Sequence, residues 1–94
     1  MRRSIRIYGK ENCDRCTKAK EKLDKLGLKY EYHLLAEILD EKNEKWRERV
    51  EEVIDLKAET CINGYSVPVL WIKDKGYLQY APAMKAAKAI AKGN

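Results

Sequence analysis

The chain has 94 residues, the size of one domain, so we expect residues 1–94 to fold as a single unit. Its 45% hydrophobic content excludes a disordered chain, and its longest apolar run, residues 67–72, is too short for a membrane-spanning helix. The net charge is +5, but the sequence has no run of five like charges and no nucleic-acid-binding motif, so nucleic-acid binding is not expected. No apolar secretion signal follows the first residue, and the sequence therefore predicts a cytoplasmic protein that binds neither membrane nor nucleic acid.

The first part of the chain alternates between strand and helix patterns. Apolar residues recur at every second position over residues 5–9 and 28–35, which predicts two strands. Helical spacing over residues 12–27, with Asn12 as the N-cap, predicts a helix between them. A longer helix is expected over residues 37–57. Its apolar face is predicted to hold Leu39, Trp46, Val50, Val53 and Ile54.

The last part of the chain predicts a strand hairpin followed by a helix. A β-branched and aromatic run over residues 67–72 is typical of a buried strand, and a turn at residues 74–76 leads into another strand over 77–80. Pro82 is suited to the first turn of the final helix. The order βαβ-α-ββα predicts an α/β fold with a four-stranded mixed sheet and helices on both faces.

The three cysteines are not spaced as a disulfide framework. Cys13 and Cys16 form a C-x-x-C pair at the start of the first predicted helix, and Cys61 is far away. This pattern indicates redox chemistry or a metal site. Cys13 lies in the first turn, where the helix dipole favours a thiolate, while Cys16 shares the apolar face, so Cys13 is the expected nucleophile and Cys16 the resolving thiol. Arg15 supports the thiolate and Asp14 opposes it.

These motifs together resemble the glutaredoxin family of small thioredoxin-like proteins. The resemblance rests on the strand at residues 5–9, on Cys-Asp-Arg-Cys at 13–16 and on Ser-Val-Pro at 66–68. It covers nearly the whole chain in element order and implies a thioredoxin fold. It also implies that Pro68 follows a cis peptide bond and faces the cysteines, and that Val67 offers its backbone to an extended substrate. Lys10 matches a lysine that supports the thiolate and binds the glutathione carboxylate.

The resemblance implies an enzyme that reduces protein or small-molecule disulfides through a reversible Cys13–Cys16 dithiol. Such a redoxin acts in electron transport and cell redox homeostasis as a monomer, with no bound cofactor or metal. Its partners would be disulfide-containing proteins or glutathione, and its electrons would come from glutathione or a thioredoxin-type reductase. The family's Gly-Gly pair after the last strand is replaced here by Leu-Gln-Tyr-Ala-Pro at residues 78–82, which favours a protein reductase.

A zinc-binding module is the alternative interpretation. Its four possible ligands would be Cys13, Cys16, His33 and Cys61. Structural zinc usually takes two close ligand pairs, and this chain has one. Otherwise Cys61 is expected to be a small apolar filler and His33 to have no role. Arg6 falls within an otherwise apolar strand, so its guanidinium must reach solvent or find a carboxylate.

Overall fold

A computed structural model describes residues 4–40, 42 and 46–93 of the chain. The four strands are β1 (Ile5–Gly9), β2 (Glu31–Leu34), β3 (Val69–Ile72) and β4 (Gly76–Leu78). The α-helices are α1 (Asp14–Lys25), α2 (Leu35–Ile38), α3 (Val50–Lys57) and α4 (Tyr80–Gly93). A 3₁₀ turn (Trp46–Arg49) precedes α3, and a π-helical turn called η2 (Ala58–Ile62) follows it. No helix within the described ranges is long and apolar enough to cross a membrane.

The strands form one mixed sheet in the order β2-β1-β3-β4. β1 lies in the middle, parallel to β2 with Ile7 opposite Tyr32, and antiparallel to β3 with Ile7 opposite Leu70. β3 and β4 form the expected hairpin. The β1-α1-β2 crossover and the hairpin confirm the fold class predicted from the sequence.

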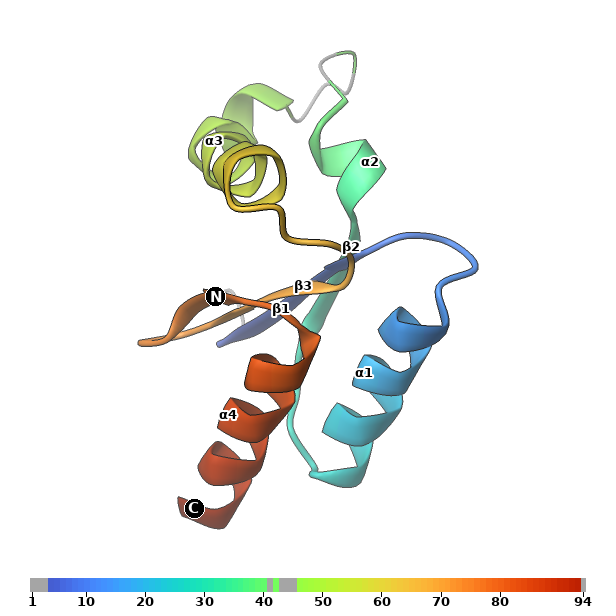
Figure 1. Ribbon diagram of the computed structural model, residues 1–94, viewed down its shortest axis with the longest axis vertical. Helices are drawn as coiled ribbons and strands as arrows, with labels where there is room; N and C mark the ends of the chain where they lie inside the picture. The colour runs from blue at the N-terminus through green and yellow to red at the C-terminus, as the bar shows by residue number, and fades with distance from the viewer. Residues whose placement is uncertain (1–3, 41, 43–45, 94) are drawn as a thin grey trace.

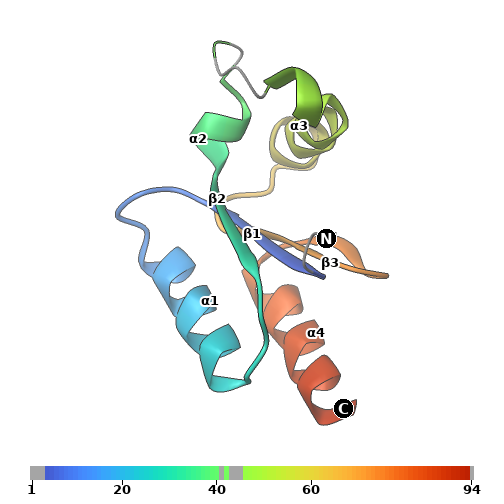
Figure 2. The same cartoon turned by 180° about the vertical axis from the view of Figure 1, so that it is seen from behind.

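Helices cover both faces of this sheet, as predicted. α1 and α4 lie side by side on one face, and α2 and α3 lie on the other (Figures 1 and 2). The α1–α4 side buries apolar residues of β1, β3 and both helices, among them Ile7, Leu23, Leu70 and Met84. The other side buries Tyr8, Ile38, Val53, Leu56 and Val69. The two core clusters lie on opposite faces of the central strands, and the site described below begins where β1 ends.

The prediction of a single long helix over residues 37–57 is wrong. The structure has the short helix α2 first and the separate helix α3 later. Ile38 and Leu56 pack in the same core cluster, although a straight helix would place them about 27 Å apart. The expected apolar face is confirmed for Val53, which is buried, and for Leu39, which packs against the same cluster. It is wrong for Val50 and Ile54, which are exposed, Ile54 by 60%. Leu56, which the prediction did not include, is buried. The expected core side chain of Trp46 lies outside the described residues.

Arg6 pairs with a carboxylate, which is one of the two arrangements expected for it from the sequence. Its Nη1 lies 3.7 Å from Oε2 of Glu52, a buried residue of α3, and its guanidinium stacks 3.9 Å from the ring centroid of Trp71. The Tyr8 hydroxyl donates a hydrogen bond to Glu52 and accepts one of 3.2 Å from Arg6. Burial raises the pKa of Tyr8 well above its ordinary value of 10.0, and the hydrogen bond to Glu52 raises it further.

This raised pKa predicts a loss of stability at alkaline pH. The neutral phenol is favoured in the folded state, so its contribution is complete below pH 10 and is lost as the pH rises further. We expect Tyr8→Phe to be less stable than the parent at pH 8, with a free energy of unfolding that falls less steeply above pH 10. Urea unfolding at several pH values from 8 upwards measures both slopes. Parallel slopes for the two proteins would contradict the assignment.

Candidate active site

The site begins in the loop that joins β1 to α1. Asn12 has a positive φ of 55°, and the chain then enters α1 at Cys13, whose backbone is extended. Cys13 is the N-cap of the helix, because its Sγ accepts a hydrogen bond of 3.2 Å from the backbone N–H of Cys16. The prediction of Asn12 as the cap is therefore wrong by one residue. The cap places the Cys13 sulfur at the positive end of the α1 dipole.

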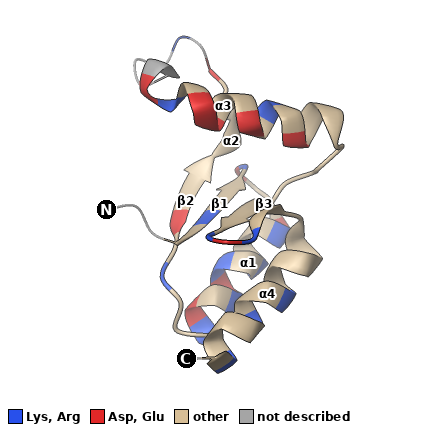
Figure 3. Cartoon of the chain, turned by 90° about the vertical axis from the view of Figure 1, so that its left-hand side faces the viewer, with Lys and Arg blue, Asp and Glu red and all other residues tan. Residues whose placement is uncertain are grey.

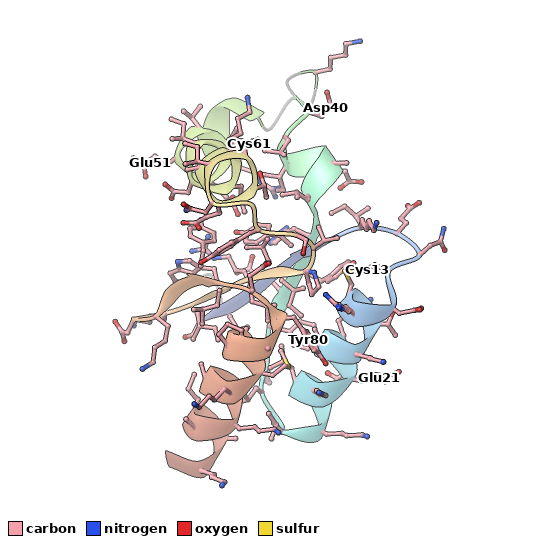
Figure 4. The ribbon with its side chains drawn as sticks, viewed as in Figure 1. Cys13, Glu21, Asp40, Glu51, Cys61 and Tyr80 are labelled. Atoms are coloured by element: carbon pink, nitrogen blue, oxygen red, sulfur yellow. A yellow bond between two sulfur atoms is a disulfide. The ribbon has the colours of Figure 1, made fainter. Side chains whose placement is uncertain are left out.

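Cys13 and Cys16 form a disulfide bond, with their Cα atoms 5.2 Å apart. The two sulfurs have different surroundings, as the sequence predicts. Cys13 is half-buried at the head of α1 (Figure 4), while Cys16 is only 1% exposed and shares the buried face of the helix with Ala19 and Leu23. An external sulfur therefore has readier access to Cys13 than to Cys16.

Gly9 is a site residue that the sequence interpretation treated only as the end of a strand. A Cβ at this position would lie 2.8 Å from the Cys16 Sγ and 2.7 Å from the Tyr32 hydroxyl, which is closer than real Cβ atoms approach. The Tyr32 hydroxyl in turn donates a hydrogen bond of 3.3 Å to the backbone carbonyl of Lys10. The absence of a side chain at Gly9 thus lets the buried sulfur pack against the sheet. A glycine directly before a C-x-x-C loop was the signal for this role.

The segment before β3 carries the expected cis peptide bond between Val67 and Pro68. Pro68 is buried and Val67 is half-buried. The side chain of Gln79 fastens this segment to the end of β4: its Oε1 accepts a 3.1 Å hydrogen bond from Ser66 N–H, and its Nε2 donates one of 2.8 Å to the Ser66 carbonyl. The sequence interpretation missed Gln79, because the pairing joins residues thirteen positions apart.

The structure brings three of the four expected substrate-binding residues into one groove. Arg15, Val67 and Pro68 line a cavity of about 330 Å³. Its other walls are Ser66, Gln79, Tyr80, Ala81 and Pro82. Lys10 is exposed and lines a separate pocket with Gly9, Glu11, Leu34, Ala36 and Glu37. The groove beside Pro68 therefore holds one expected basic residue rather than two.

The zinc-binding alternative gains no support from the geometry. Within the described ranges, no group of three or more His, Cys, Asp or Glu side chains is placed to hold a metal ion. His33 lies 3.0 Å from Glu31 and stacks on the Tyr8 ring at 5.6 Å. Cys61 is exposed on η2, in the layer of α3 and away from Cys13 (Figure 4), so the expectation of a buried apolar filler is wrong. The η2 turn that holds Cys61 has no buried residue, so its side chains fill no space in the core.

Comparison with known proteins identifies the fold and the family of this chain. A crystal structure of the glutaredoxin Grx-1 from Archaeoglobus fulgidus matches with a TM-score of 0.55 and 24% sequence identity, over 94% of this chain and 86% of that one. The fold is thus the thioredoxin fold, and the cysteine pair at the head of α1 makes the chain a C-x-x-C protein of that fold. The Glutaredoxin family model matches residues 5–77, and the chain belongs to the glutaredoxin family. No curated protein sequence matches it.

Proposed function

We propose that the protein is a disulfide reductase, and that it reduces protein or small-molecule disulfides through a reversible Cys13–Cys16 dithiol. The observation that carries this proposal is the difference in burial within the pair, combined with the Cys16 N–H directed at the Cys13 sulfur. In the reduced protein this N–H and the end of the α1 dipole favour a thiolate at Cys13. Family membership supports thiol–disulfide chemistry in general.

The proposed reaction has two exchange steps. The Cys13 thiolate attacks one sulfur of the substrate disulfide, forms a mixed disulfide and releases the other sulfur as a thiolate, which takes a proton from solvent. The Cys16 thiol then loses its proton and attacks the Cys13 sulfur, which releases the substrate's second thiolate. Two electrons pass to the substrate, and the protein is left as the Cys13–Cys16 disulfide seen in the structure. No bound cofactor or metal takes part.

The groove beside the disulfide is the proposed place for the substrate. Val67 and Pro68 precede β3 and share this groove with Arg15, which lies between the two cysteines in the sequence. We propose that an extended substrate in this groove brings its disulfide to Cys13. Val67 would pair with the substrate through its backbone, in the manner of an added strand. Lys10, which lines a separate pocket, is proposed to act on the Cys13 thiolate or on a substrate carboxylate.

The electron donor is proposed to be glutathione or a thioredoxin-type reductase. We expect a monomer in the reducing cytoplasm, where it serves electron transport and redox homeostasis and binds neither nucleic acid nor membrane. Tyr80, Ala81 and Pro82 line the groove, and they belong to the stretch where the sequence lacks the Gly-Gly pair of the family's glutathione site. This replacement favours the protein reductase.

A coupled assay tests the proposed function and its donor. NADPH consumption is followed with hydroxyethyl disulfide or insulin as the substrate, once with glutathione and its reductase and once with thioredoxin reductase. We expect turnover in both substrates and faster turnover with thioredoxin reductase. Protein reduced with dithiothreitol that transfers no electrons to either disulfide would exclude the proposed function.

A further inference from the structure

A stripe of basic residues runs along α1 from the disulfide end of the helix. The cationic stripe consists of Arg15, Lys18, Lys22 and Lys25. Their spacing of three, four and three residues keeps them on one side of the helix. The four line a groove of about 510 Å³ together with Glu21 and Tyr80. Lysines on a helix commonly form a solvated face, so a binding role requires that this groove connect with the proposed substrate site.

The stripe continues the groove that contains Pro68. Arg15 and Tyr80 line both cavities, so the two meet at these side chains. Tyr80 stands at the start of α4, facing α1, with Cys13 above it and Glu21 beside it (Figure 4). The Lys22 ammonium lies 5.2 Å from the centroid of the Tyr80 ring, which holds a cation beside an aromatic surface. A chain bound at Pro68 can therefore extend past Arg15 onto the stripe.

Charge is unevenly distributed between the two helical layers. In the layer of α1 and α4, α1 has five basic residues against three acidic ones, and α4 adds three lysines and no acidic residue. On the opposite face, α3 holds Glu51, Glu52 and Asp55 against one lysine (Figure 3). The positive layer is thus the one that adjoins the reactive disulfide, which is where charge would act on an approaching substrate.

We propose that the cationic stripe selects disulfide substrates that carry carboxylates next to their cystine. This inference rests on the proposed function and names its preferred substrate class, an acidic protein segment. Arg15 and Lys25 are ten positions apart, so the stripe is about 15 Å long. An extended segment of four or five residues spans that length at about 3.3 Å a residue. Its carboxylates meet the stripe while its disulfide lies at Cys13, and complementary charge increases the association rate.

Single-turnover reduction of matched peptides tests the proposal without any reductase. Protein reduced with dithiothreitol and then freed of it is mixed with three disulfide-looped peptides, which differ only in a following run of four Glu, four Gln or four Lys. We expect the acidic peptide to react fastest and the basic one slowest, with the difference shrinking to less than about twofold in 1 M salt. Equal rates for all three peptides at low salt would overturn the proposal.

Paired charge reversals locate the effect on the protein. Lys18→Glu with Lys22→Glu should lower the ratio of the acidic to the neutral rate constant about tenfold. The control, Lys85→Glu with Lys88→Glu, makes the same charge change on exposed positions of α4 outside the groove, and should change that ratio less than about threefold. Equal changes in both variants would mean that net charge, not the stripe, sets the preference, and would overturn the proposal.

Two further outcomes are distinguishable. Failure of the reduced wild-type protein to reduce any of the three peptides would contradict the proposed function itself rather than its substrate preference. A short single-stranded DNA that inhibits reduction of the neutral peptide at lower concentration than an acidic peptide without cystine would assign the stripe to nucleic acid. That result would overturn the proposal while leaving the disulfide chemistry intact.

Discussion

Replacing Cys16 with serine is expected to stop the reaction after its first step and leave the substrate bound covalently to Cys13. Cys13 is the more exposed of the two cysteines, and the Cys16 N–H bonded to its sulfur belongs to the backbone, so the substitution does not remove that donor. Without the Cys16 sulfur nothing within the site attacks the mixed disulfide. We expect turnover of insulin, a protein disulfide, to fall by roughly a hundredfold or more. Intact-protein mass spectrometry then shows one substrate thiol for each chain.

The reciprocal variant separates the two roles. Cys13→Ser should lose turnover and accumulate little adduct, because Cys16 is buried against Ala19 and Leu23. Cys61→Ser is the matched control, since it removes an exposed sulfur that does not line the groove and should retain full turnover. Equal trapping at Cys13 and Cys16 in the two single variants would contradict the assignment of nucleophile and resolving thiol.

The parts of the fold that the sequence predicted are those set by local patterns. Alternation in residues 5–9 and the helical spacing after them place Cys13 and Cys16 correctly at the start of α1, because these periods act over a few neighbouring residues, although the cap is Cys13 rather than Asn12. The apolar run over residues 67–72 likewise identified the buried strand β3, although Val67 and Pro68 lie before the strand, in the cis-proline segment. These elements alone placed the cysteine pair at the start of a helix that follows β1.

The errors concern features that depend on distant contacts. Residues 37–57 have an apolar spacing that is consistent with one long helix. Which residues are buried, however, depends on packing against the sheet, where Ile38 and Leu56 both belong to the cluster that contains Tyr8. Periodicity also cannot show that Glu52 is an inward position, because a carboxylate there becomes acceptable only when Arg6 faces it. The hydrogen bond from Gln79 to Ser66 and the close approach of Gly9 to Cys16 also join residues that are not neighbours in sequence, so local patterns do not predict them.

Glu52 is expected to be the acidic residue on which the stability of the fold depends most. Its carboxylate is buried, accepts the hydrogen bond of Tyr8 and lies 3.7 Å from Arg6, whose side chain is only 15% exposed. The Arg6 Nε is already buried without a hydrogen-bond partner among the described residues. Glu52→Ala removes the carboxylate that pairs with this charge, and breaking such a buried pair typically costs about 3–5 kcal/mol.

We expect the loss here to be about 2–4 kcal/mol, somewhat smaller because part of the Arg6 guanidinium reaches solvent. That is a large share of the roughly 5–15 kcal/mol that stabilises a domain. Urea unfolding measures it, and Glu51→Ala, an exposed neighbour on the same helix, is the control with an expected change below about 0.5 kcal/mol.

A double variant distinguishes an unpaired charge from a simple loss of packing. If Glu52→Ala destabilises the fold because Arg6 is left buried and unpaired, then adding Arg6→Met should recover part of the loss, since the remaining groups are apolar and can pack against Trp71. If packing alone were lost, the second substitution would add its own cost. Additive losses in the double variant, or equal stability of Glu52→Ala and Glu51→Ala, would show that the Arg6–Glu52 pair does not hold α3 to the sheet.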